Sequence, residues 1–374
     1  MLSNQRHLFD IPPDVTYLNC AYMSPLMRSV VEAGKIGLAR KSRPWEISSA
    51  DFFTQTEELR ELASRLFHCA ANDIALVPSA GYGIETAARN LPIRRGQKIL
   101  MLAEQFPSHV YPWRRVAREN GAEVATVPWP AGGDWTSAVL EQLTPEVAIA
   151  ALPHTQWTSG GLLDLERIGA ECRRHETALA LDLTQSLGVY PFDAAKVQPD
   201  FAVTAAYKWL LSPYATGVLY VAPKWHGGQP VEDGWIQRDN ARRFAELIHY
   251  TDGYQEGARR FDIGECSNFA LLPGVIAAMR QLLAWGVDEI AETAGALTRR
   301  LEQRVGMAAV PERWRAPHYL CLRADGLAVA DLAERLAKEK IYISVRGSSI
   351  RVTPHVYNTV DDVDRLAEIL SLSR

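Results

Sequence analysis

A lysine stands in one apolar stretch of the chain, and an aspartate ends an earlier one. Lys208 lies within "DFAVTAAYKWLLSPYATGVLYVAP" (200–223), and Asp182 ends "ALALD" (178–182). Lysine is almost never fully buried without a partner. The carboxyl ends of parallel strands open onto a shared crevice, which is where ligands bind in open α/β sheets. The two residues are therefore either the acid and amine of one site or a plain salt bridge at its rim.

Two further features could complete such a site. Gln185 follows Asp182 by three residues and offers a hydrogen-bonding amide. A turn of small residues precedes a predicted helix and comprises Ser79, Ala80, Gly81 and Gly83. The free N–H groups and positive dipole of a helix N-terminus suit a phosphate. This turn lacks the GxGxxG spacing of a dinucleotide fold and the GxxxxGK[ST] of a P-loop, so on its own it identifies no ligand.

Taken together, a phosphate cradle, an acid, an amide and a lysine in an apolar pocket match the needs of pyridoxal 5′-phosphate. A desolvated lysine amine can be a neutral nucleophile that forms a Schiff base with an aldehyde. The acid would pair with the pyridinium nitrogen of the cofactor. We expect no metal site, because the five cysteines lie far apart and form no CxxC pair.

At this level of detail the chain resembles the class V aminotransferase-fold enzymes, which include cysteine desulfurases, kynureninases and isopenicillin N epimerase-like proteins. Five blocks follow the order of that family: "VTYLNCAYMSPL", "DLTQSLGVYPFD", "PDFAVTAAYKWLLSPYATGVLYV", "GARRFDIGECSNFALLPG" and "SIRVTPHVYNTVDDVDRL". The resemblance implies the type I fold of pyridoxal-phosphate transferases. That fold has a large, mostly parallel seven-stranded sheet with helices on both faces, and a small C-terminal α+β domain. It also implies a homodimer with its sites at the subunit interface.

The resemblance assigns roles to residues that match the family blocks. Lys208 would form the Schiff base and serve as the catalytic residue. Asp182 would pair with the ring nitrogen, and Gln185 would hydrogen-bond the ring 3-oxygen. The backbone N–H groups of Ala80 and Gly81 would bind the phosphate.

Three more residues are implied to contact the cofactor. Phe106 would stack on the ring, and Tyr207 would reach the phosphate, both as in kynureninases. A small hydroxyl side chain often stands three residues before the lysine, but Ala205 occupies that position here. One phosphate contact is therefore missing, or Thr204 supplies it.

Substrate contacts are implied in three further segments. Arg351 matches the arginine that grips the α-carboxylate, where a bidentate guanidinium is suited to the task. Arg346 is a second candidate for the same pocket, with a surface charge as its alternative role. The loop after a predicted strand adds His154, Gln156 and Trp157. In family dimers some blocks reach the active site of the partner subunit. The residues that lie in those blocks here are Trp235, Arg259, Arg260 and Asn268.

The chain departs from cysteine desulfurases in one respect that limits the reaction. Those enzymes carry a persulfide-accepting cysteine near the stretch "ISVRGSSIRVTP", which here contains none. The expected function is therefore chemistry at the Cα of an amino acid through an external aldimine, by a lyase (C–S or other β-elimination) or a transaminase. The alternatives are an isopenicillin N epimerase-like epimerase, a kynureninase-like hydrolase and a non-catalytic relative that binds the cofactor alone.

The elements that position these residues follow from hydrophobic patterning. Apolar runs predict strands at 98–102, 123–128, 147–152, 178–182, 200–204 and 217–222. Amphipathic stretches between several of them predict helices, which is the pattern of a mostly parallel sheet covered on both faces. The run at 217–222 follows the run at 200–204 without an intervening helix, so these two strands could pair in an antiparallel direction. We place the large domain at 1–250 and the small one at 251–374.

Composition restricts the partners. The 374 residues carry a formal net charge of −4, with 47% hydrophobic and 22% charged residues, which is ordinary for a globular protein. Nothing indicates the basic face of a nucleic-acid-binding protein. No segment approaches the roughly 18 apolar residues of a membrane helix, and the N-terminus lacks a signal-peptide pattern. We expect a cytoplasmic enzyme with a small-molecule amino-acid substrate and neither nucleic acid nor membrane as a partner.

Overall fold

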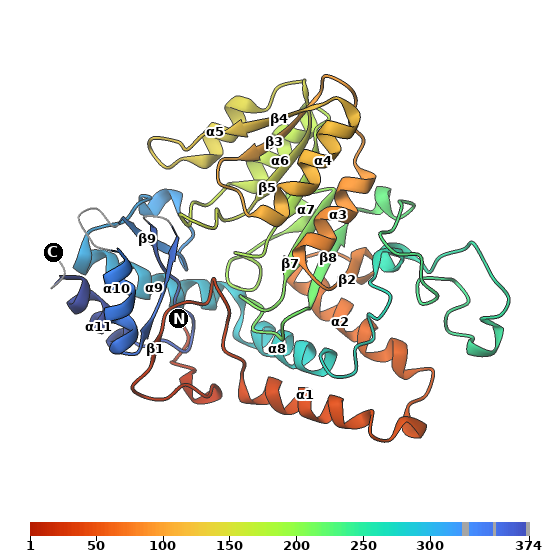
Figure 1. Cartoon of the computed structure of the whole chain (residues 1–374), viewed down its shortest axis with the longest axis horizontal. Coiled ribbons are helices and arrows are strands. Elements are labelled where there is room, and N and C mark those ends of the chain that lie inside the picture. Colours follow the sequence, from red (N-terminus) through yellow and green to blue (C-terminus); the bar gives the residue numbers. More distant parts are fainter. Residues whose placement is uncertain (324–328, 347–348, 372–374) are drawn as a thin grey trace.

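A computed structural model describes residues 1–323, 329–346 and 349–371 of the chain (Figure 1). Its largest element is a seven-stranded sheet in the order β2-β8-β7-β6-β5-β3-β4. The strands are β2 (Ile74–Val77), β3 (Lys98–Leu102), β4 (Glu123–Val127), β5 (Val147–Pro153), β6 (Ala178–Asp182), β7 (Phe201–Ala205) and β8 (Gly217–Val221). Six were predicted to within one residue at each end, whereas β2 was not predicted.

The sheet is mostly parallel, as predicted. Strands β3, β4, β5, β6 and β7 pair in parallel, while β8 is antiparallel to both β7 and β2. The antiparallel course of β8 follows from its short loop connection to β7, because a parallel neighbour needs a longer crossover. The inner strands such as β7 and β8 are buried on both faces, which explains why they are nearly continuous apolar runs, whereas the edge strand β4 is partly exposed.

Helices cover both faces of the sheet (Figure 1). One face carries α3 (Ala80–Asn90) and α4 (Tyr111–Asn120), which share an apolar cluster with alternate residues of the strands. The other face packs against α2 (Asp51–Phe67), α6 (Leu165–Arg174) and α8 (Leu272–Trp285). The remaining helices of the large sheet region are α1 (Arg28–Arg40), α5 (Trp135–Gln142) and α7 (Ala194–Val197). This arrangement confirms the predicted fold class.

The C-terminal part is a small α+β unit (Figure 1). Its antiparallel sheet has the order β11-β12-β9 and is packed with helices through an apolar cluster. The elements are α9 (Val287–Val305), β9 (Leu320–Arg323), α10 (Val329–Lys338), β10 (Ile341–Tyr342), β11 (Ser344–Arg346), β12 (Ser349–Val352) and α11 (Val360–Ser371). Short 3-10 helices lie at Arg6–Leu8, Pro44–Glu46, Ala71–Asp73, Pro107–His109, Pro223–Trp225, Phe244–Glu246, Gly257–Phe261 and Glu312–Trp314.

The N-terminal segment runs beside this small unit. Strand β1 (Thr16–Tyr17) pairs in parallel with β10, and Asn19 forms a further bridge with Thr353. Helix α8, in turn, packs with α1 and α2 beside the large sheet. The domain division at residue 250 stays a prediction.

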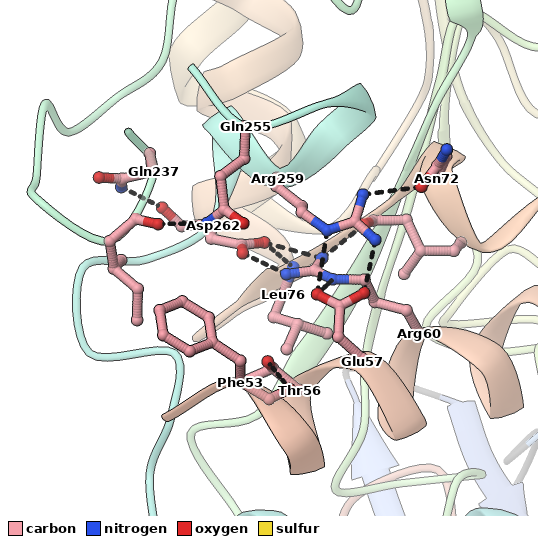
Figure 2. Close-up of polar contacts among 12 residues, drawn as sticks. Phe53, Thr56, Glu57, Arg60, Asn72, Leu76, Gln237, Gln255, Arg259 and Asp262 are labelled. Atoms are coloured by element: carbon pink, nitrogen blue, oxygen red, sulfur yellow. Dashed lines mark hydrogen bonds and ion pairs between the residues drawn. The ribbon is translucent and has the colours of Figure 1, made fainter. Parts of the chain in front are cut away.

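A buried ion pair holds strand β2 in place (Figure 2). The Arg60 guanidinium of α2 contacts the Asp262 carboxylate and also donates to the carbonyl of Ile74, at 2.6 Å. The same carboxylate accepts the N–H of Leu76 at 2.8 Å. Buried charges are tolerated when they are paired and hydrogen-bonded in this way. The pair therefore fixes β2, whose end leads directly into α3.

A second layer of polar contacts surrounds this pair (Figure 2). The Gln237 amide donates to the carbonyl of Asp262 at 2.8 Å. The Glu57 carboxylate is paired with Arg259, which also donates to the Asn72 side chain at 2.7 Å. These contacts tie the long segment before α8 to α2.

Candidate active site

A cavity of about 260 Å³ opens at the carboxyl ends of β5, β6 and β7. The carboxyl end of a parallel sheet is where α/β proteins bind ligands. Nine residues proposed from the sequence line this cavity: Ala80, Gly81, Phe106, Gln156, Trp157, Asp182, Gln185, Tyr207 and Lys208. They come from segments more than 100 residues apart, so the fold alone brings them together.

Lys208 lies in the loop after β7 and is 6% exposed. Burial lowers the pKa of its amine to about 8, against the opposing attraction of the Asp182 carboxylate. Its Nζ lies 5.4 Å from the centroid of the Phe106 ring and 5.5 Å from that of Tyr207. A lysine in this environment is partly neutral near pH 8, as a nucleophile or general base requires.

Asp182 and Gln185 are also buried, and each is held by specific partners. The Asp182 carboxylate accepts the N–H of Thr184 at 2.9 Å. The side-chain oxygen of Gln185 accepts the indole N–H of Trp209 at 2.9 Å, and its amide nitrogen donates to the carbonyl of Ala21 at 3.2 Å. Because the oxygen accepts from Trp209 and one N–H donates to Ala21, the second N–H of the amide remains available to a ligand.

The N-terminus of α3 forms one wall of the cavity. Ser79 caps the helix by accepting the N–H of Tyr82 at 3.2 Å. The first N–H groups of a helix have no intrahelical acceptor, so those of Ala80 and Gly81 are available to an anion. A Cβ at Gly81 would lie 3.7 Å from both the Cβ of Ser108 and the Oγ of Ser79, in ordinary van der Waals contact with them, so Gly81 lies close to these two serines.

Aromatic rings also line the cavity. Phe106 and Trp157 pack edge to face with centroids 5.3 Å apart, and the Trp157 indole N–H donates to the carbonyl of Glu104 at 2.6 Å. Tyr207 packs against Tyr214, whose ring is 64% exposed, with centroids 4.6 Å apart. The rings exclude water from the region around Lys208, which strengthens the electrostatic interactions there.

Polar groups of three residues in the cavity wall are buried without a hydrogen-bond partner in the described structure, namely the Gln156 amide nitrogen, the Thr155 hydroxyl and both ring nitrogens of His109. The Gln156 side-chain oxygen is fully used, because it accepts from the backbone and hydroxyl groups of Thr158 and Ser159 at 2.8–2.9 Å. Buried polar groups normally find partners, so these groups indicate a polar ligand.

Four sequence candidates lie outside the cavity lining. Arg351 is 2% exposed and adjoins the wall, because it donates to the carbonyl of Trp157 at 3.0 Å. Arg346 is half-buried near Arg351, and its guanidinium donates to the backbone carbonyl of the preceding residue, Val345, at 2.7 Å. The Thr204 hydroxyl donates to the carbonyl of Ala205 at 3.2 Å, and His154 is buried and lines a different cavity.

The residues expected to cross to a partner subunit lie away from this cavity in the single chain. Trp235 packs against Phe52 and Phe244. Arg259 belongs to the polar layer around the buried ion pair (Figure 2). Arg260 donates to the carbonyl of Gly228 at 2.9 Å, and Asn268 accepts the backbone N–H groups that begin the turn before α8.

Sequence reasoning missed several residues of the site. Gln105 braces the loop that carries Phe106, because its amide donates to the carbonyls of His109 and Ala151. Trp209 donates a hydrogen bond to Gln185, and His318 contacts both residues. A ring nitrogen of His318 lies 2.8 Å from the backbone carbonyl of Gln185, and the centroids of the His318 and Trp209 rings are 4.6 Å apart. Proximity to a strand end could have identified Gln105 and Trp209, but nothing local marks His318.

The residues present fit pyridoxal 5′-phosphate. The cavity offers a lysine with a lowered pKa, a buried carboxylate, unpaired buried donors, aromatic faces and the free N–H groups of a helix end. Five kinds of group in one small cavity match the aldehyde, ring nitrogen, 3-oxygen, ring face and phosphate that this cofactor presents.

Comparison with known proteins agrees with this geometry. Residues 38–366 match the family model described as aminotransferase class-V. A probable cysteine desulfurase of Pyrococcus abyssi is 22% identical over 345 residues, which cover 84% of this chain and 82% of that protein. An isopenicillin N epimerase of Amycolatopsis lactamdurans is 24% identical over 402 residues, covering 98% and 97%.

Solved structures have the same fold. A Lys-to-Ala mutant of C-DES with glycine covalently linked to its pyridoxal phosphate superposes with a TM-score of 0.88 at 20% identity, covering 99% of both chains. Another structure describes C-DES as a cystine C–S lyase. The family match, which spans most of the chain, confirms the resemblance found in the sequence. The chain therefore belongs to the class V aminotransferases and is a pyridoxal 5′-phosphate-dependent enzyme.

Proposed function

We propose that the protein acts at the Cα of an amino-acid substrate, either as a lyase that eliminates a β-substituent or as a transaminase. The observation that carries this proposal is the buried Lys208 amine with a pKa of about 8, in one cavity with Asp182. A lysine with this pKa can act both as nucleophile and as general base near neutral pH.

The roles of the chain's own residues follow from their positions. Bound pyridoxal 5′-phosphate supplies an aldehyde for the substrate amine and an electron-withdrawing ring. Asp182 would hold a proton on the ring nitrogen, and the Gln185 amide would donate to the 3-oxygen. Arg351 would orient the substrate by its α-carboxylate, while Lys208 would take the Cα proton. Phe106 and Trp157 would keep water out.

C–S or other β-elimination is favoured among the outcomes by two observations. C-DES, which shares the fold over nearly the whole chain, is described as a cystine C–S lyase. The stretch 343–354 contains no cysteine, so a persulfide relay on the protein is not available there. Direct elimination needs no such cysteine.

Epimerisation is the second candidate, and the match to an isopenicillin N epimerase over 98% of the chain favours it. Kynureninase-like hydrolysis would need a carbonyl in the substrate side chain. A relative that binds the cofactor without turnover is disfavoured, because Lys208, Asp182 and Gln185 are all present in one cavity.

The test compares wild type with Lys208→Ala, with Lys35→Ala on α1 as a surface control. After addition of pyridoxal 5′-phosphate, wild type and control should show a visible absorption band that shifts with amino-acid substrates. Lys208→Ala should lack that band and lose at least about 10³-fold in turnover. Product analysis for ammonia, keto acid and sulfide, and for inverted Cα configuration, then separates elimination, transamination and epimerisation. A wild type that stays colourless with added cofactor would contradict the proposal.

We also propose that the enzyme is a homodimer, as the family resemblance implies. Apolar side chains near the cavity mouth support this proposal, because Tyr22 and Tyr214 are 52% and 64% exposed. Sedimentation or light scattering of the purified chain should give twice the 41.6 kDa of one chain. A monomer with full activity would contradict the expectation.

A further inference from the structure

Two arginines lie on the same face of the β11–β12 hairpin. The strands are antiparallel, with Ser344 opposite Arg351 and Arg346 opposite Ser349. Directly opposed residues share a face, as do residues two apart on one strand, so Arg346 and Arg351 are diagonal neighbours. Such neighbours are about 7–8 Å apart at the backbone, within reach of two long side chains. The sheet therefore builds a pair of guanidinium groups beside the cavity wall.

Neither guanidinium has a carboxylate partner in the described part of the chain. The other two buried arginines do have one, because Arg60 pairs with Asp262 and Arg315 pairs with Glu302. Arg351 is buried equally deeply, yet its hydrogen-bond partners in the described structure are neutral, namely the carbonyl of Trp157 and the phenol of Tyr319. Its Nε is buried there without a hydrogen-bond partner. A buried charge without a counter-charge is costly, so the missing anion points to a ligand.

Arg346 likewise has no acidic neighbour among the described residues that shift its pKa. Burial and the nearby charge of Arg351 lower the pKa of Arg346, and its other electrostatic neighbours are the phenols of Tyr319 and Tyr22. Both arginines also lower the pKa of Lys208, although less than its burial does, so the three cations share one region. Asp182 is the carboxylate that acts on Lys208, and it is assigned to the cofactor ring.

The arrangement of charges sets a condition for the substrate. One α-carboxylate neutralises one guanidinium. Arg351 is the deeper of the two and is fixed to the carbonyl of Trp157, which lines the cavity, so it is suited to that carboxylate. Arg346 is half-buried on the outer side and would remain unpaired. A second anionic group on the substrate would complete the charge balance.

On the basis of the function proposed above, we propose that the substrate is an amino acid whose side chain ends in a carboxylate, with Arg351 binding the α-carboxylate and Arg346 the side-chain carboxylate. Guanidinium groups bind carboxylates in a bidentate manner that a neutral amide cannot reproduce. A pocket with such a group rejects the uncharged analogue, because the arginine is then left unpaired.

The test uses ligands without an amine, so that binding does not depend on reaction with the cofactor. Calorimetry on the full chain with pyridoxal 5′-phosphate added compares succinate and glutarate with butyrate, for wild type, Arg346→Gln and Arg335→Gln. Arg335 is exposed on α10 and controls for the loss of one positive charge from the small unit. The dicarboxylates should bind wild type about 10- to 100-fold more tightly than butyrate. Arg346→Gln should abolish that preference, and Arg335→Gln should retain it.

A second measurement uses the amino acids themselves. Aspartate and glutamate should shift the visible band at lower concentrations than asparagine and glutamine, and Arg346→Gln should equalise the two sets. Equal binding of dicarboxylate and butyrate by wild type, or a preference that survives Arg346→Gln, would overturn the inference while leaving the proposed function intact. Absence of the visible band would contradict the proposed function, and the calorimetry would still decide the role of Arg346.

Discussion

Lys208 is a strong base in water and a weak one in this cavity. Its pKa falls from 10.5 to about 8 because the amine is buried between aromatic rings, and the nearby Asp182 carboxylate only partly compensates. In the apoprotein, the unfolded chain holds more protons on this lysine between pH 8 and 10.5. The contribution of this group to the free energy of unfolding therefore rises with pH across that window.

The lowered pKa predicts how the rate of cofactor loading depends on pH. Only the neutral amine attacks the aldehyde, so the rate should rise about tenfold per pH unit below pH 8 and level off above it. Stopped-flow absorbance of the apoprotein mixed with pyridoxal 5′-phosphate measures this rate. A rate that keeps rising to pH 10 would show that Lys208 titrates like an exposed lysine.

Trp209 is predicted to act as a positioning residue through Gln185. In Trp209→Phe the ring is largely kept, but the Gln185 oxygen loses its buried donor at 2.9 Å. The amide can then turn, so the cofactor dissociation constant should rise about 5- to 30-fold and the pH titration of the visible band should shift. Trp113→Phe is the matched control, because Trp113 is also fully buried and its indole N–H has no partner in the described structure. Equal effects of the two substitutions would contradict a role specific to Gln185.

At the scale of elements, helix α3 is held close to strand β7 by a glycine. A Cβ at Gly83 would lie 2.5 Å from Cγ2 of Val203, a distance at which something must move. Because α3 carries the proposed phosphate cradle at its N-terminus, its distance from the sheet also sets the position of Ala80 and Gly81.

Gly83→Ala is therefore predicted to weaken both the fold and cofactor binding. The free energy of unfolding should fall by about 1–3 kcal/mol, as in overpacked cores. The cofactor dissociation constant should rise as well. Gly34→Ala on α1 is the control, because its Cβ would meet no atom closer than 3.5 Å. Urea denaturation measures the change in stability, and absorbance titration measures the change in cofactor affinity. A variant with reduced stability but the cofactor affinity of wild type would contradict the idea that the packing of α3 positions the phosphate cradle.

Sequence patterns were sufficient to predict the elements that are specified by their own residues. Five of the six predicted strands are mostly buried apolar runs, and this pattern is visible in a short window. Strand β2 was missed because its four residues follow a helix and a short turn, and its stability depends on β8 and on Arg60. The contact of Trp209 with Gln185 depends on how two loops meet, which no local pattern encodes. The predicted roles of the site residues came from family blocks and stay predictions.

On the scale of the whole molecule, the Arg60–Asp262 pair joins segments 202 residues apart (Figure 2). Asp262→Asn keeps the shape of the side chain but leaves the Arg60 charge buried without its carboxylate. The free energy of unfolding should fall by about 3–5 kcal/mol, measured by urea denaturation. Arg280→Gln removes the exposed partner of Glu58 and should change stability little. Similar small effects of both substitutions would contradict the role given to the buried pair.

The pairing of β1 with β10 also has a consequence for biosynthesis. Residues near the N-terminus reach the lysine loop, because the N–H of Ser24 donates to the carbonyl of Tyr207 at 3.1 Å and Ala21 accepts from Gln185. They are held there by β10 and Thr353, which the ribosome makes more than 300 residues later. Translation supplies the N-terminus first, at about 5–20 residues per second. The N-terminal residues can therefore take their final positions only after the C-terminal strands have been synthesised. A nascent chain cannot complete the surroundings of Lys208 before synthesis is almost finished.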